Sequence, residues 1–421
     1  MERDKTMSKK LFKQIRNEWR FNIWIFVELL IVSVVMWFIT DYIYVQARNY
    51  TEPRGFDISH CYLISMGKLT PNSHEYNSAD TTDNDDRAEL LNRIQHRPEI
   101  EAASLSQNSY PYDGSNSSMI ISHDTIQVGN DDWILRRLVT PDFVRVFRYQ
   151  GANGETPEQL ANILSKGNIL ISDNLFNKHR MPSLTALIGK TFHLDADTTR
   201  NYILGASLKP VKYNDFESAT HSYSGVVKLG KENYKDMNEL CVRVRDNMDH
   251  DFIENLWRDA DKRLRVGNLY ISDIQSFYDL RISYQRLKMN TVRNYTAGGL
   301  FLMLNIFLGI LGTFWFRTQQ RRGEIALFKA LGSTNHNVFI RQISEGIILL
   351  SVATIFATII DLNLAFANLN AVHDGIYLEP IRFIATVLIS YLLTAIMIIV
   401  GTWFPARKAM SIQPAEALHE E

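Results

Sequence analysis

Three features of the sequence have side chains that could do chemistry: a Gly-Lys-Thr triplet, the histidines and an acidic tract. A phosphate-binding loop needs a glycine five positions before Gly189 of Gly189-Lys190-Thr191, but Leu184 stands there. The histidines, such as His60 and His123, are scattered without the spacing of metal ligands, and no Gly-x-Ser-x-Gly motif occurs. We therefore predict that the chain is not an enzyme, has no catalytic residue and binds no metal or cofactor of its own.

The acidic tract closes the polar stretch 72–86, which ends in Thr81, Thr82, Asp83, Asn84, Asp85 and Asp86. An ordered calcium loop needs defined ligand spacing and a turn glycine, and both are missing here. The stretch also lacks any apolar period, so we predict a solvated, mobile loop.

The two cysteines, Cys61 and Cys241, are too few to define a disulfide framework, and their separation leaves open a disulfide or two buried thiols. The formal net charge is −1, and basic residues gather beside apolar segments rather than along one soluble face. Nucleic acid is therefore not an expected partner.

The elements that would position any site include four apolar runs, although the mean hydropathy of the chain is only −0.15. They cover 21–44, 295–316, 343–366 and 383–404, each long enough to cross about 30 Å of hydrocarbon at about 1.5 Å per residue. The alternative for the first run, a cleaved signal peptide, is disfavoured by its length and by the absence of a cleavage signal. We predict an α-helical membrane protein with four transmembrane helices, one before and three after a large α/β extracytoplasmic domain.

Basic residues in the short flanks set the predicted orientation in the lipid bilayer. Segments 1–20 and 317–342 are rich in Lys and Arg, which places both in the cytoplasm. The region 45–294 and the short loop 367–382 then lie outside, and the tail 405–421 is cytoplasmic. Within 1–20, the spacing of Leu11, Ile15 and Trp19 predicts an amphipathic helix on the inner membrane surface.

The outer region 45–294 shows a strand-helix-strand pattern twice. The first copy covers 56–66, 87–96 and 102–107, and the second covers 239–245, 252–264 and 268–272. Strand and turn signals between them predict an inserted β-rich subdomain near 110–235, with 191–194 paired to 202–206. Helical patterns over 42–50 and 273–293 predict a stalk continuous with the first two spans, the alternative being two short linkers.

The cytoplasmic loop 319–333 is the strongest candidate site. It reads as a short helix bounded by Gly323 and Gly332, and its apolar and charged side chains suit docking into a partner's groove. Composition alone would equally suit a helix resting on lipid headgroups. The candidate contact residues are Arg322, Glu324, Ile325, Leu327, Phe328, Lys329, Ala330, Leu331 and Gly332.

Together with a C-terminal motif, this loop resembles the paired signatures of bacterial ABC-transporter permeases of the MacB and FtsX kind. The loop departs from the family pattern in Gly323 before Glu324, in Ala326 where glycine is usual, and in Lys329 for arginine. The size of the outer region is similar to the MacB branch. The matching tail residues are Pro405, Ala406, Arg407, Ala409, Pro414, Ala417 and Leu418.

The resemblance implies a partner and a mechanism. A separate cytoplasmic ABC ATPase dimer, which binds ATP and Mg, would dock on the loop, and a second permease, identical or related, would complete the complex. Motion would pass through the stalk to the periplasmic domain at the bacterial inner membrane, a mechanotransmission that exports a peptide, drug, lipid or lipoprotein. A periplasmic adaptor and an outer-membrane channel could complete the route. The alternative function is a membrane-anchored sensor or scaffold without ATP-driven transport.

One acidic residue falls inside the first span. Glu28 lies about seven residues from its start, roughly 10 Å deep, where a carboxylate must face protein or carry a proton. Packing at the seam between two permeases is the favoured role, and a proton-coupled role is the alternative.

Overall fold

The computed structural model describes residues 19–124, 126–129, 133–175, 184–195 and 197–411, which form two compact units. One unit comprises residues 49–289, and the other joins the residues up to Arg48 with those from Asn290 onward. The predicted amphipathic helix over 1–20 falls almost wholly outside the described residues.

Four helices in the described part of the chain are long and apolar enough to cross a membrane, which confirms that part of the prediction. They are α2 (Trp19–Thr51), α8 (Phe277–Gln320), α10 (Asn335–Phe366) and α11 (Pro380–Met410). The 44 residues of α8 correspond to a length of about 66 Å at the usual helical rise, about twice the hydrocarbon thickness. This helix therefore contains more than a membrane span.

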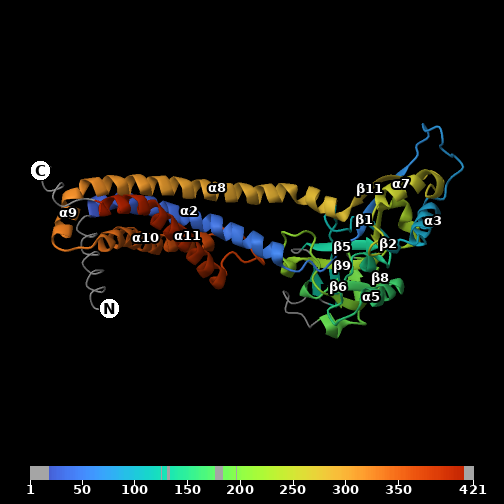
Figure 1. Cartoon of the computed structure of the whole chain (residues 1–421). Coiled ribbons are helices and arrows are strands. Elements are labelled where there is room, and N and C mark those ends of the chain that lie inside the picture. The colour runs from blue at the N-terminus through green and yellow to red at the C-terminus, as the bar shows by residue number, and fades with distance from the viewer. Residues whose placement is uncertain (1–18, 125, 130–132, 176–183, 196, 412–421) are drawn as a thin grey trace. The chain divides into compact units, whose positions relative to one another are not determined.

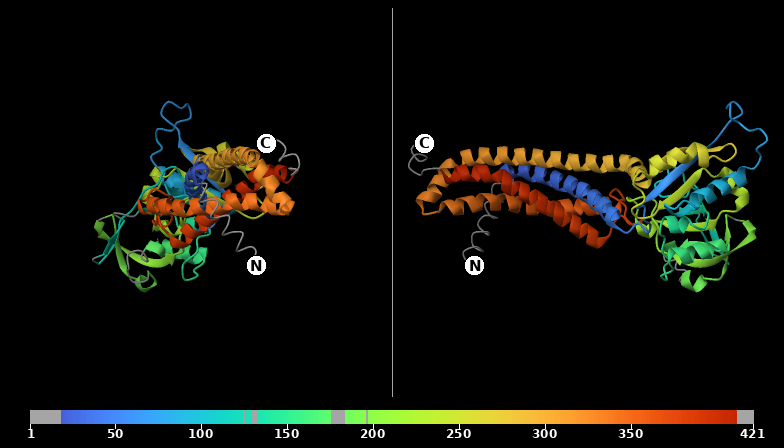
Figure 2. Two further views of the ribbon diagram at one scale, coloured as in Figure 1. Left: turned by 90° about the vertical axis from the view of Figure 1, so that its left-hand side faces the viewer. Right: turned by 45° about the vertical axis from the view of Figure 1, so that its right-hand side comes forward.

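The membrane-length helices lie side by side within their unit (Figures 1 and 2). Their shared core includes Leu29 of α2, Ile310 of α8, Leu350 of α10 and Ile398 of α11. The outward faces are also apolar, and side chains such as Ile359 are more than half exposed. Faces of this kind suit contact with lipid tails or with other helices in the membrane.

In the part of the chain that the structure describes, the second unit is built on an eleven-stranded sheet with the order β11-β1-β10-β2-β5-β9-β6-β8-β7-β3-β4. The strands are β1 (Cys61–Lys68), β2 (Ile100–Gln107), β3 (Ile121–His123), β4 (Ile126–Val128), β5 (Ile134–Val139), β6 (Ile169–Ser172), β7 (Thr191–Leu194), β8 (Asp197–Leu208), β9 (Tyr223–Lys228), β10 (Glu239–Val244) and β11 (Leu269–Ser276).

The first four strands in this order form an antiparallel sheet of two split β-α-β units, as in ferredoxin-like folds. Helices α3 (Asp83–Gln95) and α7 (Phe252–Arg263) connect the strands of each unit and pack on the same face. Leu90 of α3 and Leu256 of α7 are fully buried there against strand residues such as Ile64. The predicted repeat of a strand-helix-strand pattern is confirmed.

The residues between β2 and β10 extend the same sheet. Strand β5 pairs with β2, and β9 lies parallel to β5. The predicted pairing of 191–194 with 202–206 is present as the β7–β8 hairpin. Helices α4 (Phe143–Val146) and α5 (Pro157–Ser165) cover the other face of the sheet, and a capping box of Thr156 and Gln159 starts α5.

Three predicted boundaries are wrong. The acidic residues at the end of 72–86 belong to the first turn of α3, because carboxylates there interact favourably with the positive end of the helix dipole. The first strand begins at Cys61 rather than at Phe56. Residues 273–276 continue β11, since pairing with β1 outweighs their local helical pattern, and α8 starts only at Phe277.

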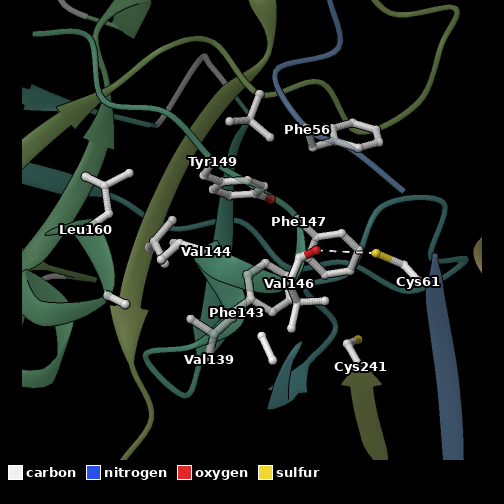
Figure 3. Close-up of a cluster of buried hydrophobic side chains, with 14 of the residues drawn as sticks. Phe56, Cys61, Val139, Phe143, Val144, Val146, Phe147, Tyr149, Leu160 and Cys241 are labelled. Atoms are coloured by element: carbon white, nitrogen blue, oxygen red, sulfur yellow. Dashed lines mark hydrogen bonds between the residues drawn. The ribbon is translucent and has the colours of Figure 1, made fainter. Parts of the chain in front are cut away.

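Both cysteines are free and buried in the cluster between the sheet and α4 (Figure 3). In the β1–β10 register, Cys61 lies opposite Arg243 and Cys241 lies opposite Leu63, so the thiols are not directly paired. The Cys61 Sγ instead donates to the Val146 carbonyl oxygen at 3.3 Å. The alternative of two buried thiols is therefore the one that the structure contains.

Candidate functional site

The candidate contact residues lie on a short helix, α9 (Arg322–Ala330), between α8 and α10, except Leu331 and Gly332, which directly follow it. The helix ends in a tight turn: the Ser333 backbone N–H donates to the Phe328 carbonyl at 3.0 Å, and Gly332 has a φ of +95°. Glycine suits this position because a left-handed residue commonly closes a helix. Thr334 then caps α10 by accepting from the Asn337 N–H at 3.3 Å.

The two faces of α9 differ in exposure. Ile325 and Ala326 are buried, and Ile325 packs against Val338 of α10. Leu327 is 50% exposed and Leu331 is 77% exposed, although both are large apolar side chains. Residues four apart lie on the same side of a helix, so these two leucines form one apolar strip that the described residues leave exposed.

The inner side of α9 is held to α10 by charged groups. Arg321 contacts Glu345 at 3.3 Å and Glu324 at 3.8 Å, and Arg341 contacts Glu324 at 3.6 Å. The Arg341 guanidinium also lies 4.3 Å from the centre of the Phe328 ring. These groups surround a cavity of about 60 Å³. Glu324 thus holds α9 in place, whereas its predicted role was contact with a partner.

A hydrogen bond joins the predicted loop to the last helix, because the Lys329 Nζ donates to the Met410 carbonyl at 2.9 Å. Pro405 and Ala406 are buried inside α11, and Arg407 is exposed near its end. Ala409 lies in the last turn of α11. Pro414, Ala417 and Leu418 lie outside the described residues. The structure therefore brings the start of the C-terminal motif beside α9.

The remaining predicted site residue, Glu28, is half-buried in α2. A Cβ built on Gly309 of α8 would lie 2.5 Å from its Oε1, so the carboxylate fits against the glycine backbone. Glu28 belongs to a helix–helix contact within the unit, well apart in sequence from the loop residues.

Sequence reasoning missed a buried ion pair at the other end of this unit. The Arg382 Nε lies 3.1 Å from the Asp41 Oδ1, and both side chains are 1% exposed. The Asn370 Nδ2 donates to the other Asp41 oxygen at 3.0 Å. The available signal was the position of the two charges, one near the end of the first span and one at the start of the fourth.

The described residues contain four membrane-length helices, a large sheet unit between the first two in sequence, and the short helix α9 between the second and the third. A comparison with known families identifies part of this arrangement. Residues 297–414 match the family model described as FtsX-like permease C-terminal, which covers α9, α10, α11 and the second half of α8. A comparison with curated protein sequences gives no match.

The matched region thus includes every described residue of the C-terminal motif. The chain therefore contains an FtsX-like permease domain, and this domain supports the resemblance to FtsX/MacB-like ABC-transporter permeases. Permeases of this family generally work with a cytoplasmic ATPase partner.

Proposed function

We propose that this chain couples ATP hydrolysis by a separate cytoplasmic ATPase to work on the opposite side of the membrane, with α9 as the docking helix. The observation that carries the proposal is the exposed pair Leu327 and Leu331, on a helix whose other side is fixed to α10. An apolar strip on a short helix fits a hydrophobic groove of a partner protein.

The contacts of α9 define the path by which a pull on it would reach the membrane. Arg321 and Arg341 link α9 to α10, and Lys329 links it to the end of α11. Displacement of α9 by the ATPase would therefore move both helices together. A continuous α8, which starts in the sheet unit, would carry the motion out of the membrane.

The proposal extends to the setting of the complex. We place the chain in the bacterial inner membrane with the sheet unit in the periplasm, in a homodimer or heterodimer of permeases bound to an ATPase dimer. The cargo would be a peptide, drug, lipid or lipoprotein handled on the periplasmic side. An adaptor and an outer-membrane channel are further candidate partners.

The test is co-purification of the solubilised chain with the ATPase encoded nearest to it. Leu327→Asp combined with Leu331→Asp should abolish the association, because a charge in an apolar groove cannot be solvated. Leu369→Asp is the matched control, since Leu369 is a 60% exposed leucine in the loop between α10 and α11. Undiminished association of the double variant would refute α9 as the docking helix.

Glu324→Lys would be a weaker test of the docking role. This substitution would place a third cation beside Arg321 and Arg341, and it would disturb the seat of α9 even if Glu324 never touched a partner. The leucine variants avoid that problem because their side chains are exposed.

A further inference from the structure

A segment of the sheet unit, Pro210 to Ala219, forms hydrogen bonds or ion pairs with the end of α2 and with the start of α8. Both helices continue into the helical unit. The segment follows β8 and lies beside the last residues of α2 and the first turns of α8. We call it the joint segment.

The joint segment holds the end of α2 and the residue that follows it, Glu52, through hydrogen bonds. The fully buried Lys212 donates from Nζ to the Asn49 carbonyl, and the Asn49 side-chain amide donates to the Phe216 carbonyl at 3.0 Å. The Ala219 N–H donates to the Glu52 carboxylate at 3.0 Å. The end of α2 is thus fixed from both its backbone and its side chains.

Burying the ammonium group of Lys212 costs free energy of solvation, and two neighbouring groups offset this cost. Burial lowers the pKa of Lys212, while the nearby carboxylate of Glu52, 3.9 Å away, works in the opposite direction. The last carbonyls of a helix carry partial negative charge, so an ammonium group there is favourable. A buried lysine of this kind specifies one position of the helix end relative to the segment.

The contact with α8 is an ion pair on the same segment. Asp215 is 1% exposed, and the Arg281 Nε of α8 donates to it at 2.6 Å. The Tyr112 hydroxyl donates to the other carboxylate oxygen at 2.7 Å. Burial alone would raise the pKa of Asp215, but hydrogen bonds from Gln285, Tyr112 and Arg281 outweigh it and lower that pKa.

Arg281 also connects the two helices to each other. Its Nη2 donates to the Tyr50 hydroxyl of α2 at 3.1 Å, and its guanidinium lies 5.7 Å from the centre of that ring. Arg281, which belongs to α8, therefore contacts both α2 and the joint segment.

The joint segment is also part of a cavity wall. Val211, Tyr213, Glu217 and Ser218 line a cavity of about 270 Å³ whose other residues include Trp133. On the helix side, the Tyr213 ring meets the Tyr284 ring of α8 edge to face, with centres 5.8 Å apart. A shift of α8 would therefore reach the cavity through Tyr213 as well as through Asp215.

We propose that the joint segment transmits helix motion to the sheet unit and reshapes this cavity, with Arg281 and Lys212 as positioning residues. The inference rests on the proposed function, because it needs ATP-driven motion of α2 and α8. It adds the place where that motion enters the sheet unit and the cavity that responds.

The test is backbone hydrogen exchange of the full chain bound to its ATPase in lipid nanodiscs, with and without ATP and vanadate. In the wild type, ATP should change exchange in the first turns of α8, in the joint segment and in β9. In Arg281→Ala, the change in α8 should persist while the change in the joint segment falls at least about threefold. Arg286→Ala, an exposed arginine of α8, should behave as the wild type.

The outcomes separate the two proposals. If Arg281 only stabilised the fold, its loss would raise hydrogen exchange in the joint segment equally with and without ATP. An undiminished ATP-dependent change in Arg281→Ala would therefore refute the proposed transmission through the joint segment. No ATP-dependent change anywhere in the wild type would overturn the proposed function together with this role. If Arg281→Ala fails to fold, Tyr50→Phe removes only the hydroxyl at the same point and should give a reduced response of the same kind.

Discussion

Cys61 and Cys241 are thiols that burial keeps protonated. Desolvation raises the pKa of Cys61 to about 12, and it raises the pKa of Cys241 well above its usual value. At pH 8 only about one Cys61 thiol in ten thousand would be ionised, and only the thiolate attacks an electrophile.

We expect neither cysteine to react with a maleimide in the folded, solubilised chain, and both to react after denaturation without a reductant. Mass spectrometry of the labelled chain measures this directly. Rapid labelling of the native chain would contradict the burial, and a need for reductant after denaturation would show that a disulfide forms.

Glu239 is a carboxyl group of the sheet unit that titrates near neutral pH. Its oxygens accept from the Ser106 hydroxyl and the Asn108 N–H, each at 2.7 Å, but burial is the larger effect and raises its pKa to about 7. The folded state therefore holds a proton that the unfolded state loses above about pH 4.5. The stability from this group is complete below that pH and is lost as the pH rises to about 7.

Glu239→Gln should remove this pH dependence, because the amide is neutral at every pH. The wild type should lose at most about 3 kcal/mol between pH 4.5 and 7 from this group, and the variant should lose less. Heat unfolding of the solubilised chain, followed by circular dichroism across that range, gives the measurement. Glu254→Gln, at an exposed position of α7, should keep the wild-type slope, and an equal slope in Glu239→Gln would disprove the assignment.

At the scale of elements, the buried pair of Asp41 and Arg382 joins α2 to α11. Removing one partner leaves the other charge buried alone, whereas removing both can be nearly neutral. Arg382→Met or Asp41→Leu alone should lower stability by about 3–5 kcal/mol, and the double variant should recover most of it. Thermal denaturation in detergent tests this cycle.

The pair of Arg48 and Glu379 is the control for that cycle. Its groups are similarly close, 3.0 Å apart, but each side chain is about a third exposed. Arg48→Met should therefore cost less than about 1 kcal/mol. Equal losses in Arg48→Met and Arg382→Met would show that burial is not the deciding factor.

Local sequence patterns predicted the elements well where one physical signal dominates. Twenty apolar residues in a row define a membrane-length helix, and alternation around Val242 defines a strand, without knowledge of any partner. The helical pattern over 273–276 failed because pairing with β1, some 200 positions earlier, decides the conformation there.

The sequence indicated which segment forms the candidate site, but not which of its side chains are exposed or which ion pairs they form. Leu327 and Leu331 could be named, yet their exposure depends on how α9 seats on α10. The ion pair of Glu324 with Arg341 was not predictable, because Arg341 comes from another helix. Asp41 and Arg382 lie 341 positions apart, and nothing local to either indicates the other.

At the scale of the whole molecule, the proposed orientation puts α9 and the sheet unit on opposite sides of the membrane. Reporter fusions at Gly332 and Gly114 should therefore be active on opposite sides. Gly114 is an exposed position with no atom within 4 Å of a built Cβ, so an insertion is tolerated there. A third fusion at Leu369 should match Gly114, and agreement between Gly114 and Gly332 would exclude the orientation.

The two helices that enter the sheet unit are attached to it differently. Residues 52–60 separate α2 from β1, whereas β11 ends at Ser276 and α8 begins at Phe277 without an intervening residue. A loop relieves rotation of a helix about its own axis, but a direct covalent junction does not. Torque on α8 would therefore twist β11 and its neighbour β1. A force on α2 would reach the sheet unit only through the hydrogen bonds between α2 and the joint segment. In the proposed mechanism, rotation of α8 would therefore reach the sheet unit directly, whereas translation could reach it from both helices.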